Sequence, residues 1–219
     1  YPMMLSVDFK CIKKFWNNPR GLYLTIFVNW IIKPFSMAGI GILFFHFIFK
    51  DFVTIEDANS YIAGMILLGV APCTAMVFIW SRLVNGDPNY TLLQVSINDL
   101  ILILAFPIIT KILLNVTGIT IPWSTLIGSV VLYIITPLVA AAITRYFFLS
   151  NKEEKVNELI DLLKPFSILG LLLTITILFG LQADKINDKP FIMLLISIPL
   201  IFQTIGIFAI TYFLAFKLS

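Results

Sequence analysis

Long apolar segments alternate with short polar ones along the whole chain. Six apolar stretches reach the roughly 20 residues that a helix needs to cross the hydrocarbon core of a bilayer. They cover residues 22–49, 61–80, 90–114, 121–149, 165–183 and 190–216. Several stretches exceed that minimum, so their helices have room to tilt. The pattern predicts an all-α, polytopic transmembrane helical bundle that forms a single domain over residues 1–219.

The second apolar stretch contains a proline, Pro72, followed directly by a cysteine, Cys73. Because proline lacks a backbone donor and clashes with the preceding turn, the sequence predicts a broken helix at Pro72–Cys73. Broken backbone at membrane depth persists only inside protein or beside a polar cavity. A thiol there suits a carrier of soft metals or metalloids. The alternative is that Cys73 is simply a small buried hydrophobe.

Composition narrows the class of protein further. Hydrophobic residues make up 59% of the chain and charged residues 12%, which is too apolar for a soluble domain with one core. The net charge of +3 is small and the basic residues lie in short loops, so no nucleic-acid partner is expected. Cys11 lies beside a basic loop and Cys73 within a span, which does not indicate a disulfide framework.

Basic residues are concentrated in alternate loops. The first, third and fifth loops carry Lys10, Lys13, Lys14, Arg20, Arg82, Arg145, Lys152, Lys155 and Lys164. Because cytoplasmic loops retain positive charge, we expect the first loop to be cytoplasmic. Residues 150–164 alternate acidic and basic side chains on a helical period, and we interpret them as a cytoplasmic linker between two groups of spans.

The predicted spans contain few ionisable residues, and each is notable because a charge at the bilayer centre costs several kcal/mol. At about 1.5 Å per residue, Lys33 lies roughly 16 Å and Asp99 roughly 13 Å from the cytoplasmic side. Cys73 lies about 20 Å from the outer side. The polar residues expected at this depth are Asn29, Thr74, Gln94, Ser96 and Asn98. Transporters bind solutes near the midplane at broken helices, so this layer is the predicted solute site.

Two interpretations of Lys33 and Asp99 remain open at this stage. They either take part in proton coupling or form a structural ion pair that joins two helices. In the second case we expect Asn29 and Asn98 to supply hydrogen bonds to the pair. We interpret Arg82 differently, as a residue whose long side chain extends to the inner membrane surface.

Three motifs lie close together between Ala71 and Asp99. They are Ala71-Pro-Cys-Thr-Ala-Met-Val-Phe-Ile-Trp-Ser81, Asn85-Gly-Asp-Pro-Asn-Tyr-Thr91 and Gln94-Val-Ser-Ile-Asn-Asp99. Residues 1–4, 29–37 and 180–182 add shorter matches in the same order. Together these motifs resemble the Acr-type arsenical-resistance permeases, which are grouped with the bile acid/sodium symporters. The resemblance extends over nearly the whole chain.

The resemblance implies a fold of ten spans in two inverted five-helix repeats, each with a broken helix. By this reasoning the chain is expected to be an internal fragment that runs from the end of the second span to the eighth. A functional glutamate of the family lies in the later broken helix, which we expect beyond Ser219.

The resemblance also implies a function: export of arsenite, and of antimonite, across the cell membrane in exchange for protons. It implies no cofactor, and it leaves the oligomeric state open. The essential cysteine of the family maps onto Cys73, whose thiol exchanges for a hydroxyl of the metalloid. We assign Thr74 and Asn98 to the substrate site as well, with Asn29 and Pro72 supporting it.

Three alternatives differ in class. A sodium-coupled symporter of organic anions would have no need of the Cys73 thiol. A membrane-embedded hydrolase could use Asp99, although one carboxylate lacks the second that such an enzyme needs. A purely structural membrane subunit would tolerate neutral substitutions at every polar position of the layer.

Overall fold

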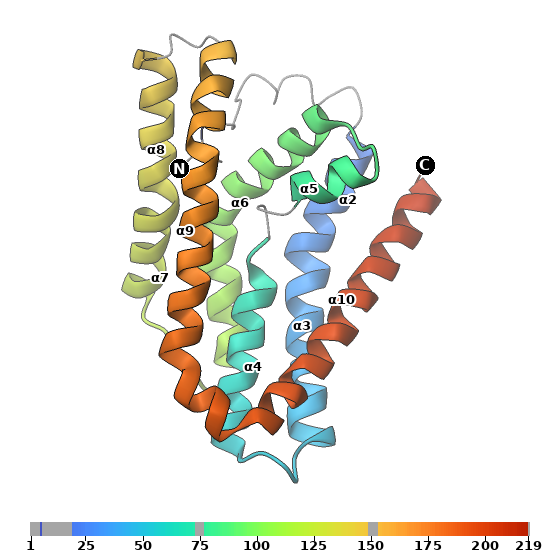
Figure 1. The fold of residues 1–219 in the computed structure, drawn as a ribbon. Coiled ribbons are helices and arrows are strands. Elements are labelled where there is room, and N and C mark those ends of the chain that lie inside the picture. Colours follow the sequence, from blue (N-terminus) through green and yellow to red (C-terminus); the bar gives the residue numbers. More distant parts are fainter. Residues whose placement is uncertain (1–4, 6–18, 73–76, 149–152, 219) are drawn as a thin grey trace.

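The computed structural model describes residues 5, 19–72, 77–148 and 153–218, and this part of the chain is helical without a strand. The helices run up and down in a bundle (Figure 1). In chain order they are α2 (Arg20–Phe27), η2 (Val28–Ile32), α3 (Lys33–Ile42), η3 (Leu43–Ile48), α4 (Ile55–Val70), α5 (Val77–Leu83), α6 (Pro88–Asn115), α7 (Trp123–Val130), η4 (Val131–Ile135), α8 (Thr136–Ile143), η5 (Thr144–Phe148), α9 (Glu153–Asp188) and α10 (Pro190–Leu218). The expected all-α bundle is confirmed.

Within the described residues, five continuous stretches of helix are long and apolar enough to cross a membrane. They are Arg20–Ile48, Tyr90–Asn115, Trp123–Phe147, Glu154–Asp184 and Pro190–Lys217. The second predicted span is divided between α4, with 16 residues, and α5, with 7. The six spans predicted from the sequence include these two pieces as one span. The boundaries of the six predicted spans therefore stay a prediction.

Helix α9 begins well before the apolar stretch that defines its span. Residues 153–164, which we interpreted as a cytoplasmic linker, are helical and continue into the rest of α9. The alternation of acidic and basic side chains there suits a helix, because opposite charges three or four residues apart stabilise it. A charged helical segment therefore stands at one end of the longest span.

Two spans contain a π-helical turn before a proline. The local sequences are alike: Trp30-Ile-Ile-Lys-Pro34 and Tyr133-Ile-Ile-Thr-Pro137. In each, the π-helical segment ends two residues before the proline, at Ile32 and at Ile135. Because proline has no N–H and its ring crowds the preceding carbonyls, the widened turn relieves the clash. In the second span, the Thr136 hydroxyl donates to the Val131 carbonyl oxygen at 2.8 Å.

A cluster of buried hydrophobic residues lies where α3 packs against α4. Its members include Met37, Phe45, Ile62 and Ile66. The two helices pack tightly at Gly69, where a Cβ atom would lie 2.8 Å from both Cβ and Cγ of Met37. Only glycine fits this close approach.

Replacing Gly69 by alanine is expected to destabilise the protein by about 1–3 kcal/mol, because the added methyl group overlaps Met37 and forces α3 and α4 apart. Thermal unfolding in detergent would measure the loss. Gly64→Ala is the matched control, since a Cβ atom on Gly64, also in α4, would have no neighbour within 4 Å. Equal melting temperatures for the two variants would contradict the close packing at Gly69.

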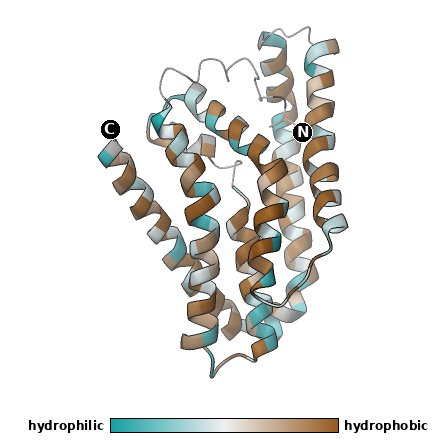
Figure 2. Cartoon of the chain, turned by 180° about the vertical axis from the view of Figure 1, so that it is seen from behind, coloured by the Kyte–Doolittle hydropathy of each residue, from teal (hydrophilic) through white to brown (hydrophobic). Residues whose placement is uncertain are grey.

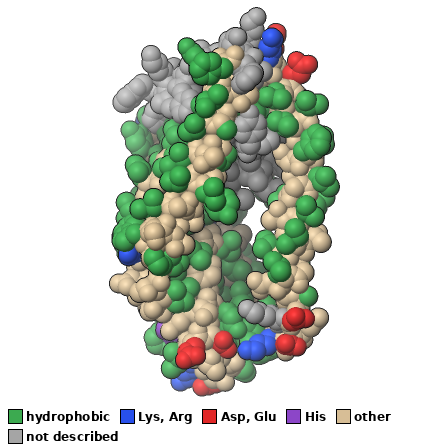
Figure 3. Space-filling model, turned by 90° about the vertical axis from the view of Figure 1, so that its left-hand side faces the viewer, with side chains coloured by type: hydrophobic (Ala, Val, Ile, Leu, Met, Phe, Trp, Pro, Cys, Tyr) green, Lys and Arg blue, Asp and Glu red, His purple; other side chains and the backbone are tan. Residues whose placement is uncertain are grey.

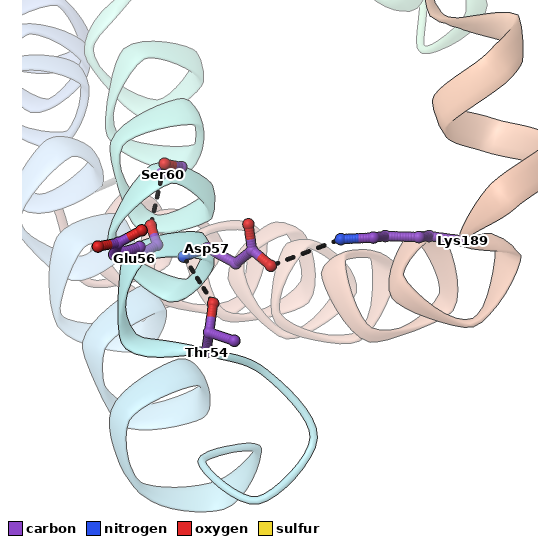
Figure 4. A network of polar contacts seen from close by, with 5 residues as sticks. All are labelled: Thr54, Glu56, Asp57, Ser60 and Lys189. Atoms are coloured by element: carbon purple, nitrogen blue, oxygen red, sulfur yellow. Dashed lines mark hydrogen bonds and ion pairs between the residues drawn. The ribbon is translucent and has the colours of Figure 1, made fainter.

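The start of α4 is tied to the turn between α9 and α10 (Figure 4). Lys189 Nζ lies 3.6 Å from Asp57 Oδ2, and the two side chains are 57% and 41% exposed. The Thr54 hydroxyl caps α4 by accepting from the Asp57 N–H at 3.3 Å. Exposed ion pairs contribute little, about 0–1 kcal/mol, so this contact orients the turn more than it stabilises the fold.

Many large hydrophobic side chains are exposed, and hydrophobic residues recur along the long helices of the bundle (Figure 2). In the most apolar 18-residue stretch of α9, no residue is buried inside the protein. Figure 3 shows hydrophobic side chains over one face, and an open gap beside the column of side chains at the right of that view. Such a surface suits hydrocarbon rather than water, as expected of a multi-pass membrane protein.

Candidate functional site

The helix break begins where α4 ends, among the other helices of the bundle (Figure 1). Helix α4 ends at Val70, and Ala71 adopts an extended backbone with φ −80° and ψ 125°. A residue before proline avoids the helical region because the proline ring clashes with its backbone, which explains the position of the end. The predicted break before Pro72 is confirmed. Cys73 and Thr74 lie outside the described residues.

A ladder of polar contacts joins the first span to α6. Thr25 Oγ1 donates to Gln94 Oε1 at 3.1 Å, and Asn29 Nδ2 donates to Asn98 Oδ1 at 3.2 Å. Both pairs are 69 residues apart in sequence. The two helices therefore run in the same direction, and the two contacts lie about one helical turn apart on each of them.

Asn98 is the most highly connected side chain of this ladder. Its Oδ1 also accepts from Trp30 Nε1 at 3.0 Å, and its Nδ2 donates to the Gln94 carbonyl oxygen at 2.8 Å. The side chain is 3% exposed. Asn29 and Asn98, both expected at the solute layer, thus contact one another directly.

Lys33, one turn beyond Asn29, makes a contact with the helix break. Its Nζ donates to the Ala71 carbonyl oxygen at 2.8 Å. From α10, Gln203 Nε2 donates to the Lys33 carbonyl oxygen at 3.1 Å and to Ser36 Oγ at 2.8 Å. Gln203 is 4% exposed. Three spans thus meet at the end of α4.

Asp99 lies on a different face of α6 from Asn98, because successive residues of a helix point about 100° apart. It is 7% exposed, and no hydrogen bond or ion pair between described residues involves its carboxylate. Ser96, on the same side of α6, is also buried, and its hydroxyl has no hydrogen-bond partner among the described residues. The proposed pairing of Asp99 with Lys33 stays a prediction.

Asn98→Leu is expected to destabilise the protein by about 1–3 kcal/mol, because it leaves the Asn29 and Trp30 donors without their acceptor. Unfolding in detergent, followed by tryptophan fluorescence, would measure it. The control is Asn115→Leu, at the exposed end of the same helix. If both variants unfold alike, the ladder does not hold the two helices together.

Sequence reasoning missed four of the polar residues at this site: Thr25, Trp30, Ser36 and Gln203. The available signal for Gln203 was a lone amide in the apolar span 190–216, since polar side chains inside a membrane bundle find partners on neighbouring helices. Among the described residues, no group of three His, Cys, Asp or Glu side chains could hold a metal ion.

Comparison with known proteins gives consistent results. Residues 1–189 match the Sodium Bile acid symporter family. Arsenical-resistance protein Acr3 of Alkaliphilus metalliredigens is 46% identical over 214 residues, 97% of this chain and 60% of that protein. Uncharacterized transporter slr0944 of Synechocystis is 38% identical over 100% of this chain and 60% of that protein.

A further relative, Arsenical-resistance protein Acr3 of Corynebacterium glutamicum, is 27% identical over 100% of this chain and 59% of that protein. The chain therefore spans about three fifths of the length of the curated relatives it matches. No solved structure matches it.

Proposed function

Because the chain belongs to the sodium bile acid symporter family, we propose that its protein is a membrane transporter that exports arsenite from the cytoplasm. The observation that carries the proposal is the 46% identity, over 97% of the chain, to a relative named as an arsenical-resistance protein. The break at Ala71–Pro72 supports it, because irregular backbone inside a membrane bundle is where transporters bind solute.

Cys73 is the proposed ligand of arsenite. Its thiol replaces one hydroxyl of arsenous acid, so that a sulfur–arsenic bond forms and one water leaves. Attack by water on the other side of the membrane reverses the exchange and restores the thiol. Arsenic stays trivalent throughout, so no oxidant or reductant is needed. Thiolate sulfur prefers such soft centres, and antimonite, with the same valence, is proposed as a second substrate.

The remaining site residues have supporting roles in this proposal. Thr74 and Asn98 contact the hydroxyls of the solute, while Asn29 orients Asn98 through their hydrogen bond. Pro72 keeps the backbone ahead of Cys73 out of the helix. Proton exchange drives export, with Asp99 as the candidate for a carboxyl that gains and loses the proton.

Arsenite uptake into everted membrane vesicles tests the proposal. Vesicles that contain the full-length protein are expected to accumulate radiolabelled arsenite when their interior is acidified, and antimonite is expected to compete. Vesicles without the protein are the control. Absence of uptake at any pH gradient would exclude arsenite as the solute.

A sodium-coupled symporter of organic anions is the second candidate, because the family takes its name from such a transporter. The two candidates differ in their requirement for sodium and for the thiol. Taurocholate uptake that depends on sodium and survives Cys73→Ala would favour the second candidate.

A further inference from the structure

The carbonyl group of Ala71, the extended residue that directly follows α4, accepts a hydrogen bond from a lysine of another helix. The final carbonyls of a helix have no partner within the helix and carry the negative end of its dipole. In this protein Lys33 Nζ, 38 residues earlier in the chain, donates to the Ala71 oxygen at 2.8 Å. The bond places a cation close to the C-terminus of α4, where the helix dipole favours it.

The bond depends on the close approach of α3 and α4. A Cβ atom on Gly69 would lie 2.8 Å from Met37 Cβ and 3.8 Å from the Lys33 carbonyl oxygen. The last turn of α4 therefore packs directly on the turn of α3 that begins with Lys33. This packing brings the Ala71 carbonyl oxygen within hydrogen-bonding reach of Lys33 Nζ.

A residue of α10 also contacts the turn of α3 that begins with Lys33. Gln203 Nε2 donates both to the Lys33 carbonyl oxygen, at 3.1 Å, and to Ser36 Oγ, at 2.8 Å. The Ser36 hydroxyl donates to the Lys33 carbonyl oxygen at 3.1 Å. Burying an amide in a membrane span without hydrogen-bond partners has a high free-energy cost. The contacts of Gln203 therefore hold α10 to this turn.

We propose that Lys33 and Gln203 are positioning residues for the helix break: Lys33 binds the carbonyl group of Ala71, the residue that follows α4, and Gln203 holds the backbone of Lys33 in place. The two contacts join α3, α4 and α10 close to Ala71, which lies two residues before Cys73 in the sequence. Their importance for transport rests on the function proposed above. The contacts themselves do not depend on which solute is carried.

The chemical accessibility of Cys73 provides the test. The full-length protein in membrane vesicles is treated with N-ethylmaleimide, without arsenite, and alkylation of Cys73 is followed by mass spectrometry of its peptide. Lys33→Met keeps the unbranched stem but lacks the donor. We expect its Cys73 to react roughly tenfold faster, because a hydrogen bond from a charged donor is lost and the break loosens. Lys33→Arg, which still donates, is expected to stay within about twofold of the parent protein.

Gln203→Leu tests the second contact, and it also decides the proposal if Lys33→Met does not reach the membrane. We expect roughly threefold faster alkylation, since the hydrogen bonds lost there are neutral and weaker. Thr204→Val is the matched control, because Thr204 is exposed and its hydroxyl donates only within α10, to the Leu200 carbonyl oxygen at 2.8 Å.

Equal alkylation rates in Gln203→Leu and Thr204→Val, or in Lys33→Met and Lys33→Arg, would overturn the positioning role. Arsenite export by the same vesicles is measured separately. Faster alkylation in the two test variants, from a protein that exports no arsenite, would support the positioning role and exclude the proposed substrate.

Discussion

Replacing Cys73 by alanine is expected to lower arsenite export by roughly 100-fold or more, since loss of even a supporting contact in a metal site costs about 10–100-fold. The reason is chemical. The layer around the break otherwise offers amides, hydroxyls and carboxyls, which are hard ligands, and the thiol is the soft ligand that arsenite prefers. Export is measured as arsenite uptake into everted vesicles at equal amounts of protein.

Two controls make this prediction specific. Cys73→Ser keeps the size of the side chain and replaces sulfur by a hard oxygen, so it is expected to fail as Cys73→Ala does. Cys11→Ser removes the other cysteine of the chain and is expected to export normally. Arsenite export that persists in Cys73→Ala vesicles would remove the thiol from the mechanism and favour a carrier of another kind of solute.

The sequence predicts these helices well because the length of an apolar stretch that crosses a membrane is set by the thickness of the bilayer. The stretch 190–216 corresponds to α10 at Pro190–Leu218, and 90–114 to α6 at Pro88–Asn115. The break before Pro72 was equally predictable, since a proline in a span acts through its own ring and missing donor. These features depend on local chemistry alone.

The contacts between helices were less predictable, because they depend on how the helices pack. Lys33 and Asp99 were expected at one depth, and depth says nothing about which face of a helix a side chain occupies. The close approach at Gly69 is also a property of packing, and it decides where Lys33 can reach. Gln203 shows the same limit, since its partners are Ser36 and a backbone carbonyl group.

The π-helical turns lie between these two cases. Two of the four π-helical segments in the described part of the chain, η2 and η4, precede a proline and so have a local cause, whereas η3 and η5 have no proline next to them. Proline alone does not distinguish a π-helical turn from a simple kink, as Pro107 and Pro199 show by lying within continuous α-helix. The repeated pattern of an aromatic residue, two isoleucines, one further residue and proline is the feature that η2 and η4, the two π-helical segments before a proline, share.

Asp99→Asn is expected to abolish the dependence of arsenite export on a pH gradient while leaving the protein folded. Asp99 is 7% exposed, and no described residue forms a hydrogen bond or ion pair with its carboxylate. An ionised carboxylate at that depth has a high energetic cost unless a cation or a proton compensates it. Asparagine has nearly the same shape and cannot exchange the proton, so arsenite accumulation should fall to the level reached without a gradient.

The same variant distinguishes proton coupling from a structural ion pair with Lys33. If the two charges paired, removing either one would cost about 3–5 kcal/mol, and removing both would restore much of the loss. Because Lys33 Nζ binds the Ala71 carbonyl oxygen, we expect the effects of Lys33→Met and Asp99→Asn on unfolding in detergent to add within about 0.5 kcal/mol. A double variant markedly more stable than that sum, together with export that still follows the pH gradient in Asp99→Asn, would assign Asp99 to the ion pair and move proton coupling to another residue.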